Sequence, residues 1–226
     1  MWGQPPSAVR SSEARPGFRR EAANLPASRF VLMFFENLAN RGVLAHNDSK
    51  GDLVKTAIEA INQMQADGVI GKYAIGGAVG ATLYLEPAAT IDLDIFVVLP
   101  TAVGGLLTLT PIYEYLKSRG AKVVDEYIEI DGWAVQFLPP SNDLETEAVA
   151  EAVSTTVEGV RTWVMSAEHL VAIALRTGRS KDHIRLLQFI EREAVNRTKL
   201  QSLIEKHGLT LKWKQFESKY LEGADE

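Results

Sequence analysis

The spacing of the apolar residues changes at Gly68. Before this glycine, Ile58, Ile61 and Met64 recur at helical spacing. After it, the stretches VIGKYAI and IDLDIFVVL have the composition and period of strands. The segment between them, AVGATLYLE, is long enough for about two helical turns. This succession predicts strand, short helix and strand in a mixed α/β (α+β) fold.

A hairpin is predicted at Asp131-Gly132, the strongest short hairpin signal in the chain. The turn joins KVVDEYIEI to WAVQFL, and a Pro-Pro pair ends the second strand. Pairing outward from the turn places the apolar residues of both strands on one face. It places Glu129 and Gln136 together on the other face.

The chain is expected to divide into four parts. Residues 1–25 are rich in Pro, Ser, Gly and Arg and predict a disordered arm. Residues 26–45 predict a packing helix, and residues 46–160 a domain with a small mixed sheet and helices. In residues 161–221, helix-capping residues and helical spacing predict a helical C-terminal subdomain.

The charge changes sign along the chain. The net charge is −5, but residues 31–160 carry 7 basic and 18 acidic residues, whereas residues 161–219 carry 12 and 6. A cleft between two such parts can hold a metal ion on one wall and phosphate on the other; the alternative is that both are solvated faces. The chain has no cysteine, which excludes a disulfide framework, a thiolate zinc site and a cysteine nucleophile.

One uncharged stretch, residues 95–113, is long enough to span a membrane. It contains two prolines and two glycines, so it is better explained by a strand, a loop and the start of a helix. The N-terminal residues lack the apolar core of a signal peptide. We therefore expect a cytoplasmic protein without a membrane segment.

Two short motifs could carry chemistry together. Gly76 and Gly77 end one strand and begin the short helix, where backbone N–H groups can approach a phosphate. Asp92 and Asp94 lie in the next strand, and the period of two points both carboxylates to one face. Two hard oxygen ligands at this spacing favour Mg²⁺ or Mn²⁺.

The order of these motifs resembles the nucleotidyltransferase superfamily, specifically the AbiEii-type toxins and minimal nucleotidyltransferases. YAIGGAVGATLYLEPAATIDLDIFVV is similar to their block of twin glycine, helix and T-x-D-x-D, with Gly76, Gly77, Thr90, Asp92 and Asp94 at the matching positions. The resemblance implies a sheet of nucleotidyltransferase type. It also implies that the glycines and Thr90 bind a nucleoside triphosphate and that the aspartates bind the metal.

A second, looser similarity lies in SAEHLVAIALRTGRSKDHIRLL, where Arg179, Lys181 and Asp182 follow a small-residue turn. The resemblance implies that Arg179 and Lys181 contact the nucleotide. The implied reaction moves a nucleoside monophosphate from a nucleoside triphosphate to an acceptor hydroxyl on a protein, an RNA or a small molecule. For both basic residues, an ordinary role in solubility and helix capping is the alternative.

Three positions depart from the family pattern. Ala88 and Ala174 replace an Arg and a Lys, and Gln136 stands where many relatives have a third Asp. A glutamine can position a hydroxyl but cannot act as a base, so Glu129 is the candidate substitute on the same hairpin face. The departures leave open a catalytically silent nucleotide-binding or regulatory module of a toxin–antitoxin system, with a cognate regulatory protein. An interaction domain without a nucleotide is the third hypothesis.

Overall fold

A computed structural model of the chain describes residues 50–85, 92–100 and 107–221. The predicted arm (1–25), the predicted packing helix (26–45) and Thr90 lie outside the described residues. The described helices are α2 (Lys50–Ala66), α3 (Gly77–Ala81), α4 (Thr110–Lys117), α5 (Asp143–Ala150), α6 (Ala167–Thr177), α7 (Ser180–Glu191), α8 (Arg197–Lys206) and α9 (Thr210–Tyr220). The strands are β1 (Tyr73–Ile75), β2 (Asp92–Val97), β3 (Lys122–Val124), β4 (Tyr127–Ile130), β5 (Trp133–Leu138), β6 (Val153–Val157) and β7 (Val160–Val164).

The seven described strands form one mixed sheet in the order β3-β4-β5-β2-β1-β7-β6. β2 pairs antiparallel with β1 and parallel with β5, and it therefore lies in the middle of the sheet. The α/β class with a small mixed sheet is confirmed. The sheet extends to Val164, past residue 160, where the sequence suggests the helical part begins.

The Asp131-Gly132 hairpin has the predicted register, with Ile130 opposite Trp133 and Glu129 opposite Ala134. Both turn residues have positive φ, +49° and +87°, as a two-residue hairpin of this type requires. The segment KVVDEYIEI is different from the single strand that its composition suggests. It folds into β3 and β4 around a tight turn at Asp125, whose φ is +52°.

Each face of the sheet contacts its own hydrophobic core. One core lies between the sheet and helices α2 and α4 and includes Ile58, Leu93 and Ile95, all 2% exposed or less. The other core lies on the opposite face and joins Ala74 and Phe96 of the sheet to the C-terminal helices. Alternate residues of β2 therefore belong to opposite sides of the sheet.

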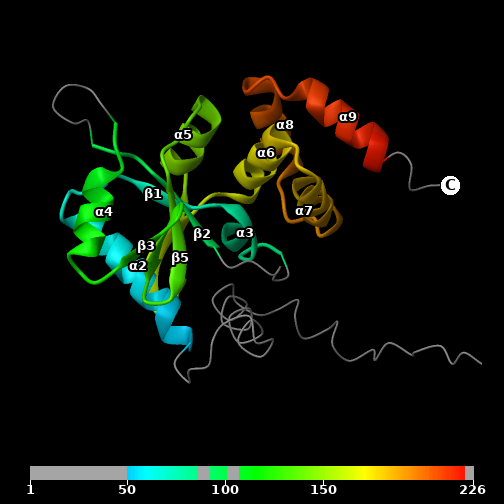
Figure 1. The fold of residues 1–226 in the computed structure, drawn as a ribbon. Helices are drawn as coiled ribbons and strands as arrows, with labels where there is room; N and C mark the ends of the chain where they lie inside the picture. The colour runs from blue at the N-terminus through cyan, green and yellow to red at the C-terminus, as the bar shows by residue number, and fades with distance from the viewer. Residues whose placement is uncertain (1–49, 86–91, 101–106, 222–226) are drawn as a thin grey trace, which may run out of the picture.

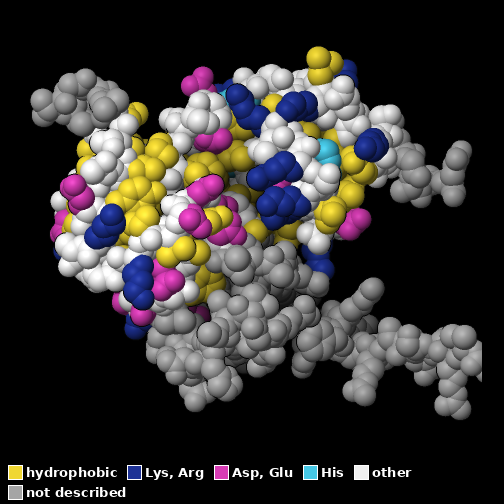
Figure 2. All heavy atoms as spheres, viewed as in Figure 1, with side chains coloured by type: hydrophobic (Ala, Val, Ile, Leu, Met, Phe, Trp, Pro, Cys, Tyr) yellow, Lys and Arg dark blue, Asp and Glu magenta, His cyan; other side chains and the backbone are white. Residues whose placement is uncertain are grey.

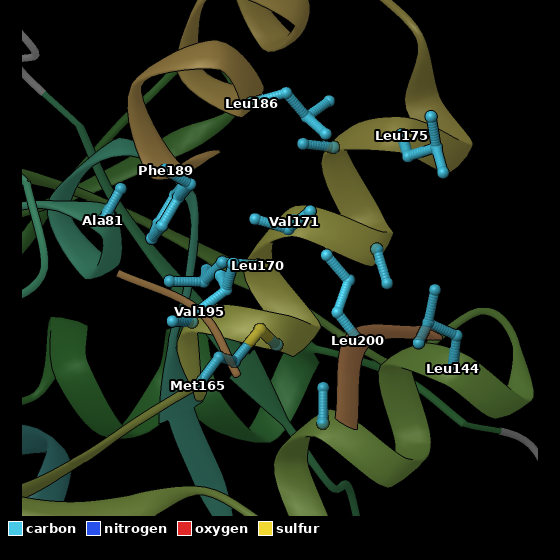
Figure 3. Packing of buried hydrophobic residues seen from close by; sticks show 14 of the residues in the cluster. Ala81, Leu144, Met165, Leu170, Val171, Leu175, Leu186, Phe189, Val195 and Leu200 are labelled. Carbon is cyan, nitrogen blue, oxygen red and sulfur yellow. The ribbon is translucent and has the colours of Figure 1, made fainter. Parts of the chain in front are cut away.

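The helical C-terminal part packs on the second core, and Figure 1 shows α6 to α9 gathered at one end of the sheet. Figure 3 shows how Leu170 and Val171 of α6 lie among residues from α3, α5, α7 and α8. The predicted cap at Ser166 is present, because its side chain accepts from the backbone N–H of His169 at the start of α6. The caps predicted at Ser180 and Thr198 are wrong: Arg179 caps α7 and Asn196 caps α8. This packing sets where α7 begins relative to β2.

None of the described helices has the length and apolar character needed to cross a membrane. The uncharged stretch 95–113 contributes the end of β2 and the start of α4, in agreement with the strand and helix start expected from the sequence.

Candidate functional site

The two aspartates of β2 lie on the same face of the sheet. In the ladder with β5, Asp92 is opposite Ala134 and Asp94 is opposite Gln136. Both carboxylates are half-buried, whereas Leu93 between them is 2% exposed and packs on the opposite face. We call the face that carries these two carboxylates, with Ala134, Gln136 and Glu129, the acidic face.

The Asp94 carboxylate lies directly against Gly77. A β-carbon built on Gly77 would be 1.8 Å from Asp94 Oδ2, and Gly77 has φ +55°. Both facts require glycine, because there is no space for a side chain and because L-residues rarely adopt this conformation. Gly77 and Asp92 are 15 positions apart in sequence, and the glycine bend and the aspartate pair therefore form one constellation.

Gly76 has a different physical role from its neighbour. A β-carbon at Gly76 would be 2.7 Å from the Phe96 ring, so the glycine makes room for the second core. Its N–H donates to the Asp94 backbone oxygen at 2.9 Å. The Gly76 N–H is therefore used in the pairing of β1 with β2, whereas the Gly77 N–H does not take part in this pairing.

Asp94 is a partly desolvated acid with a second acid, Asp92, beside it. Burial, and then the neighbouring Asp92 charge, raise the pKa of Asp94 to about 6, although Lys181, Arg179 and Arg185 act in the opposite direction. Arg179 directly precedes α7, and Lys181 and Arg185 lie in the first half of that helix. The sequence-predicted acidic and basic motifs are therefore brought into electrostatic contact.

The basic group faces the sheet because of the turn between α6 and α7. Gly178 ends α6 in the left-handed conformation with φ +72°, and Arg179 follows at once as the residue before α7. Figure 2 shows acidic side chains over the sheet and Lys and Arg side chains over the C-terminal helices on the same face of the molecule. The acidic and basic parts of the sequence thus place an acidic group and a basic group near each other on this face of the molecule.

Asp182 holds this turn together. It is 1% exposed and accepts from the Arg179 side-chain Nε at 2.9 Å and from the Arg179 backbone N–H at 3.3 Å. Its other oxygen lies 3.9 Å from Arg185 Nη1. Asp182 is therefore a positioning residue for the cations near Asp94.

The Asp182→Asn variant should lower the free energy of unfolding by about 1–3 kcal/mol, because buried hydrogen bonds to a charged group are lost. Urea denaturation measures this change. Asp143→Asn, on the exposed first turn of α5, is the matched control and should change stability by less than about 0.5 kcal/mol. Equal effects of the two variants would contradict the positioning role.

Glu129 and Gln136 share the acidic face as predicted. Ala134 of β5 is opposite Glu129 of β4 on one side and opposite Asp92 of β2 on the other. Only the methyl group of Ala134 therefore stands between Glu129 and Asp92 across the sheet. A groove of about 510 Å³, lined by Thr56, Arg119 and Lys122 among others, also runs past Glu129.

Arg185 is a site residue that the sequence reasoning missed. Its charge acts on Asp94, and its side chain is 19% exposed. The signal was present, because Arg185 is four residues after Lys181 and so lies on the same helical face. The resemblance drew attention only to the turn.

Comparison with known proteins gave matches among solved structures, while no family model and no curated protein matches the chain. A nucleotidyltransferase-like antigenic protein from Paracoccidioides brasiliensis is similar at 18% identity, with a TM-score of 0.46; the alignment covers 74% of this chain and 91% of that one. The antibiotic-resistance factor ANT(2'')-Ia is similar at 14% identity, with a TM-score of 0.45, over 77% and 98% of the two chains.

Proposed function

We propose that this protein is a divalent-cation-dependent nucleotidyltransferase, as the resemblance of its motifs implies. The observation that carries the proposal is the Asp94 carboxylate seated against Gly77, with Asp92 beside it and the cations of α7 opposite. An ionised acid that is desolvated and next to another acid is unfavourable for folding and is typical of functional sites.

The residues present fit a bound Mg²⁺ or Mn²⁺. Asp92 and Asp94 supply two hard oxygen donors on one face, and the missing β-carbon of Gly77 leaves room for the carboxylate beside the bend. When bound, the cation would neutralise charge on the triphosphate of a nucleoside triphosphate. Asp92 and Asp94 are the proposed ligands.

The remaining roles fall to residues of the chain itself. The Gly77 N–H, Arg179, Lys181 and Thr90 would bind the phosphates, and Gly76 shapes the bend that presents that N–H. Arg185 would add a further positive charge on the same side. These contacts orient the α-phosphate toward the acidic face, where an acceptor can approach.

In the proposed reaction, the oxygen of an acceptor hydroxyl forms a bond to the α-phosphorus. The bond from that phosphorus to the oxygen bridging the α- and β-phosphates breaks, and pyrophosphate leaves with the electron pair. The hydroxyl proton would pass to the Glu129 carboxylate, with the Gln136 amide holding the hydroxyl. The acceptor is a protein, an RNA or a small molecule.

One observation favours a second candidate, a catalytically silent nucleotide-binding module. Gln136 is directly opposite Asp94, so an amide stands at the acidic-face position where the family pattern has its third carboxylate. An amide cannot neutralise the charge of a metal ion. In that case the same site would bind a nucleotide as a regulatory module, for example in a toxin–antitoxin pair with a cognate protein.

Calorimetry with ATP, GTP, CTP and UTP, with and without Mg²⁺, tests the nucleotide site. We expect Mg²⁺-dependent binding of at least one nucleotide and its loss in the Asp92→Asn/Asp94→Asn variant. Asp125→Asn, at the exposed turn before β4, is the matched control and should bind as the wild type does. Retained binding in the double variant would refute the metal site.

Incubation with α-labelled nucleotides and cell lysate separates the two candidate functions. A labelled protein, RNA or small molecule that depends on Asp92 and Asp94 indicates transfer. Release of pyrophosphate should accompany it in equal amount, since the reaction forms both products together. Nucleotide binding without label transfer or pyrophosphate release supports the silent module.

A further inference from the structure

A second group of ligand-type side chains lies away from the acidic face, between α5 and α6. One ring nitrogen of His169 and one carboxylate oxygen each of Glu147 and Glu151 all lie within 4.8 Å of one another. Glu147 and Glu151 are four residues apart at the end of α5 and so share one helical face. His169 lies in the first turn of α6, next to α5 in Figure 1.

The histidine supplies an observation independent of the carboxylates. His169 is 0% exposed, and its Nε2 is the buried side-chain nitrogen for which the described part of the chain shows no hydrogen-bond partner. Buried polar groups in folded proteins are almost always paired. An unpaired imidazole nitrogen beside two carboxylates therefore calls for a group that the protein itself does not supply.

Ser166 lies against the other ring nitrogen of His169. Its Oγ is 2.9 Å from His169 Nδ1. With the proton on Nδ1, the ring donates to the Ser166 oxygen. Nε2 then presents a lone pair, the form in which histidine binds metals.

A lone pair facing carboxylates is repulsive unless a cation lies between them. Glu147 already has two partners, Lys206 Nζ at 2.8 Å and His207 Nε2 at 2.7 Å, but both contact its Oε2. Within the described residues, Oε1 of Glu147 makes no such contact. Glu151 is exposed, and Lys199 Nζ lies 3.9 Å from its Oε2, so this carboxylate can turn toward a cation.

We propose that His169 Nε2, Glu147 and Glu151 bind a divalent transition-metal cation, with water completing the coordination. One imidazole nitrogen and two carboxylate oxygens suit Zn²⁺, whereas Mg²⁺ prefers an all-oxygen shell. Ser166 and His207 would orient the ligands from the outer shell, as hydrogen-bonded partners do in protein metal sites. This site is distinct from the acidic face.

The position of this cation gives it a structural role. α5 follows β5, and α6 leads to the Gly178 turn and the cations of α7. A metal joining α5 to α6 would hold the helical part at a constant place on the sheet. Because ligands must come together from two elements, metal binding should stabilise the folded state.

The test uses the Asp92→Asn/Asp94→Asn protein, so that the acidic face cannot bind the titrated metal. After treatment with a chelator, we expect one equivalent of Zn²⁺ to bind and to raise the thermal midpoint, while Mg²⁺ does neither. Co²⁺ in place of Zn²⁺ should give the visible absorption of a low-coordinate site with a nitrogen ligand. Failure of this test leaves the nucleotide site untouched, because that site is absent from the protein used.

Three further variants assign the ligands. Glu151→Gln, at an exposed position that tolerates substitution, should weaken Zn²⁺ binding at least about tenfold, as should His169→Gln. Glu191→Gln, an exposed acid at the end of α7, should bind Zn²⁺ as the parent does. The proposal is overturned if the parent binds no Zn²⁺, or if Glu151→Gln binds it unchanged.

Discussion

The Asp94→Asn variant is expected to be more stable than the wild type and unable to bind a nucleotide with Mg²⁺. Burial and the charge of Asp92 raise the pKa of Asp94 from 3.8 to about 6. Two pKa units correspond to about 3 kcal/mol of unfavourable free energy in the folded state when the carboxyl is ionised. Asparagine keeps the shape and removes the charge.

The sign of the pH dependence follows from the direction of the shift. Below the unfolded pKa of 3.8, the Asp94 carboxyl is protonated in both the folded and the unfolded state and does not lower the free energy of unfolding. Between pH 4 and 6 the folded state retains a proton that the unfolded state has released, so the destabilisation grows with pH and is complete above about pH 6. The difference in unfolding free energy between Asp94→Asn and wild type should therefore be small at pH 4 and largest at pH 7–8.

Thermal unfolding in the presence of a chelator measures this difference. For a chain of this size we expect an increase in midpoint of roughly 4–10 °C at pH 7. Nucleotide affinity with Mg²⁺ should fall at least about tenfold. The Asp125→Asn control should change neither quantity, and a variant that is both less stable and fully able to bind would contradict the functional role.

The Gly77→Ala variant is expected to lose both stability and nucleotide binding. The added methyl carbon would lie 1.8 Å from Asp94 Oδ2, so the carboxylate must leave its place. The positive φ adds about 1–2 kcal/mol of strain for an L-residue. Together we expect a loss of roughly 2–3 kcal/mol in unfolding free energy and at least about tenfold in affinity.

Gly68→Ala is the matched control for this prediction. Gly68 has φ +73°, and a β-carbon there would meet nothing within 4 Å, so only the backbone strain remains. Its affinity for the nucleotide should equal that of the wild type. In the Asp94→Ala background, the cost of Gly77→Ala should fall to that of Gly68→Ala; an unchanged cost would mean that the carboxylate is not the obstacle.

Local patterns were sufficient to predict most of the fold. The alternation in IDLDIFVVL predicted which β2 side chains face each side, and Asp131-Gly132 predicted the register of β4 with β5. These signals are local, since the period of two and the turn geometry depend on neighbours in sequence. The turn at Asp125 carries no glycine or proline, so the sequence shows no break between β3 and β4.

The tertiary contacts of the site were beyond reach of such patterns. That Gly77 accommodates Asp94, and that Gly76 accommodates Phe96, depends on how β1 and β2 pair. The cluster of His169 with Glu147 and Glu151 joins residues about 20 positions apart through helix packing alone. In the sequence, the spacing of these residues is the same as that of ordinary surface or core residues, so no pattern marks either arrangement.

The central position of β2 has a consequence for the acid pair when no ligand is bound. A shift of this strand by one residue would turn Asp92 and Asp94 into aliphatic surroundings and expose Leu93 and Ile95 to water. The ladders with β1 and β5 on both sides oppose such a shift collectively. These two ladders therefore oppose the mutual repulsion of the two carboxylates. They keep Asp92 and Asp94 aligned on one face when no cation is bound.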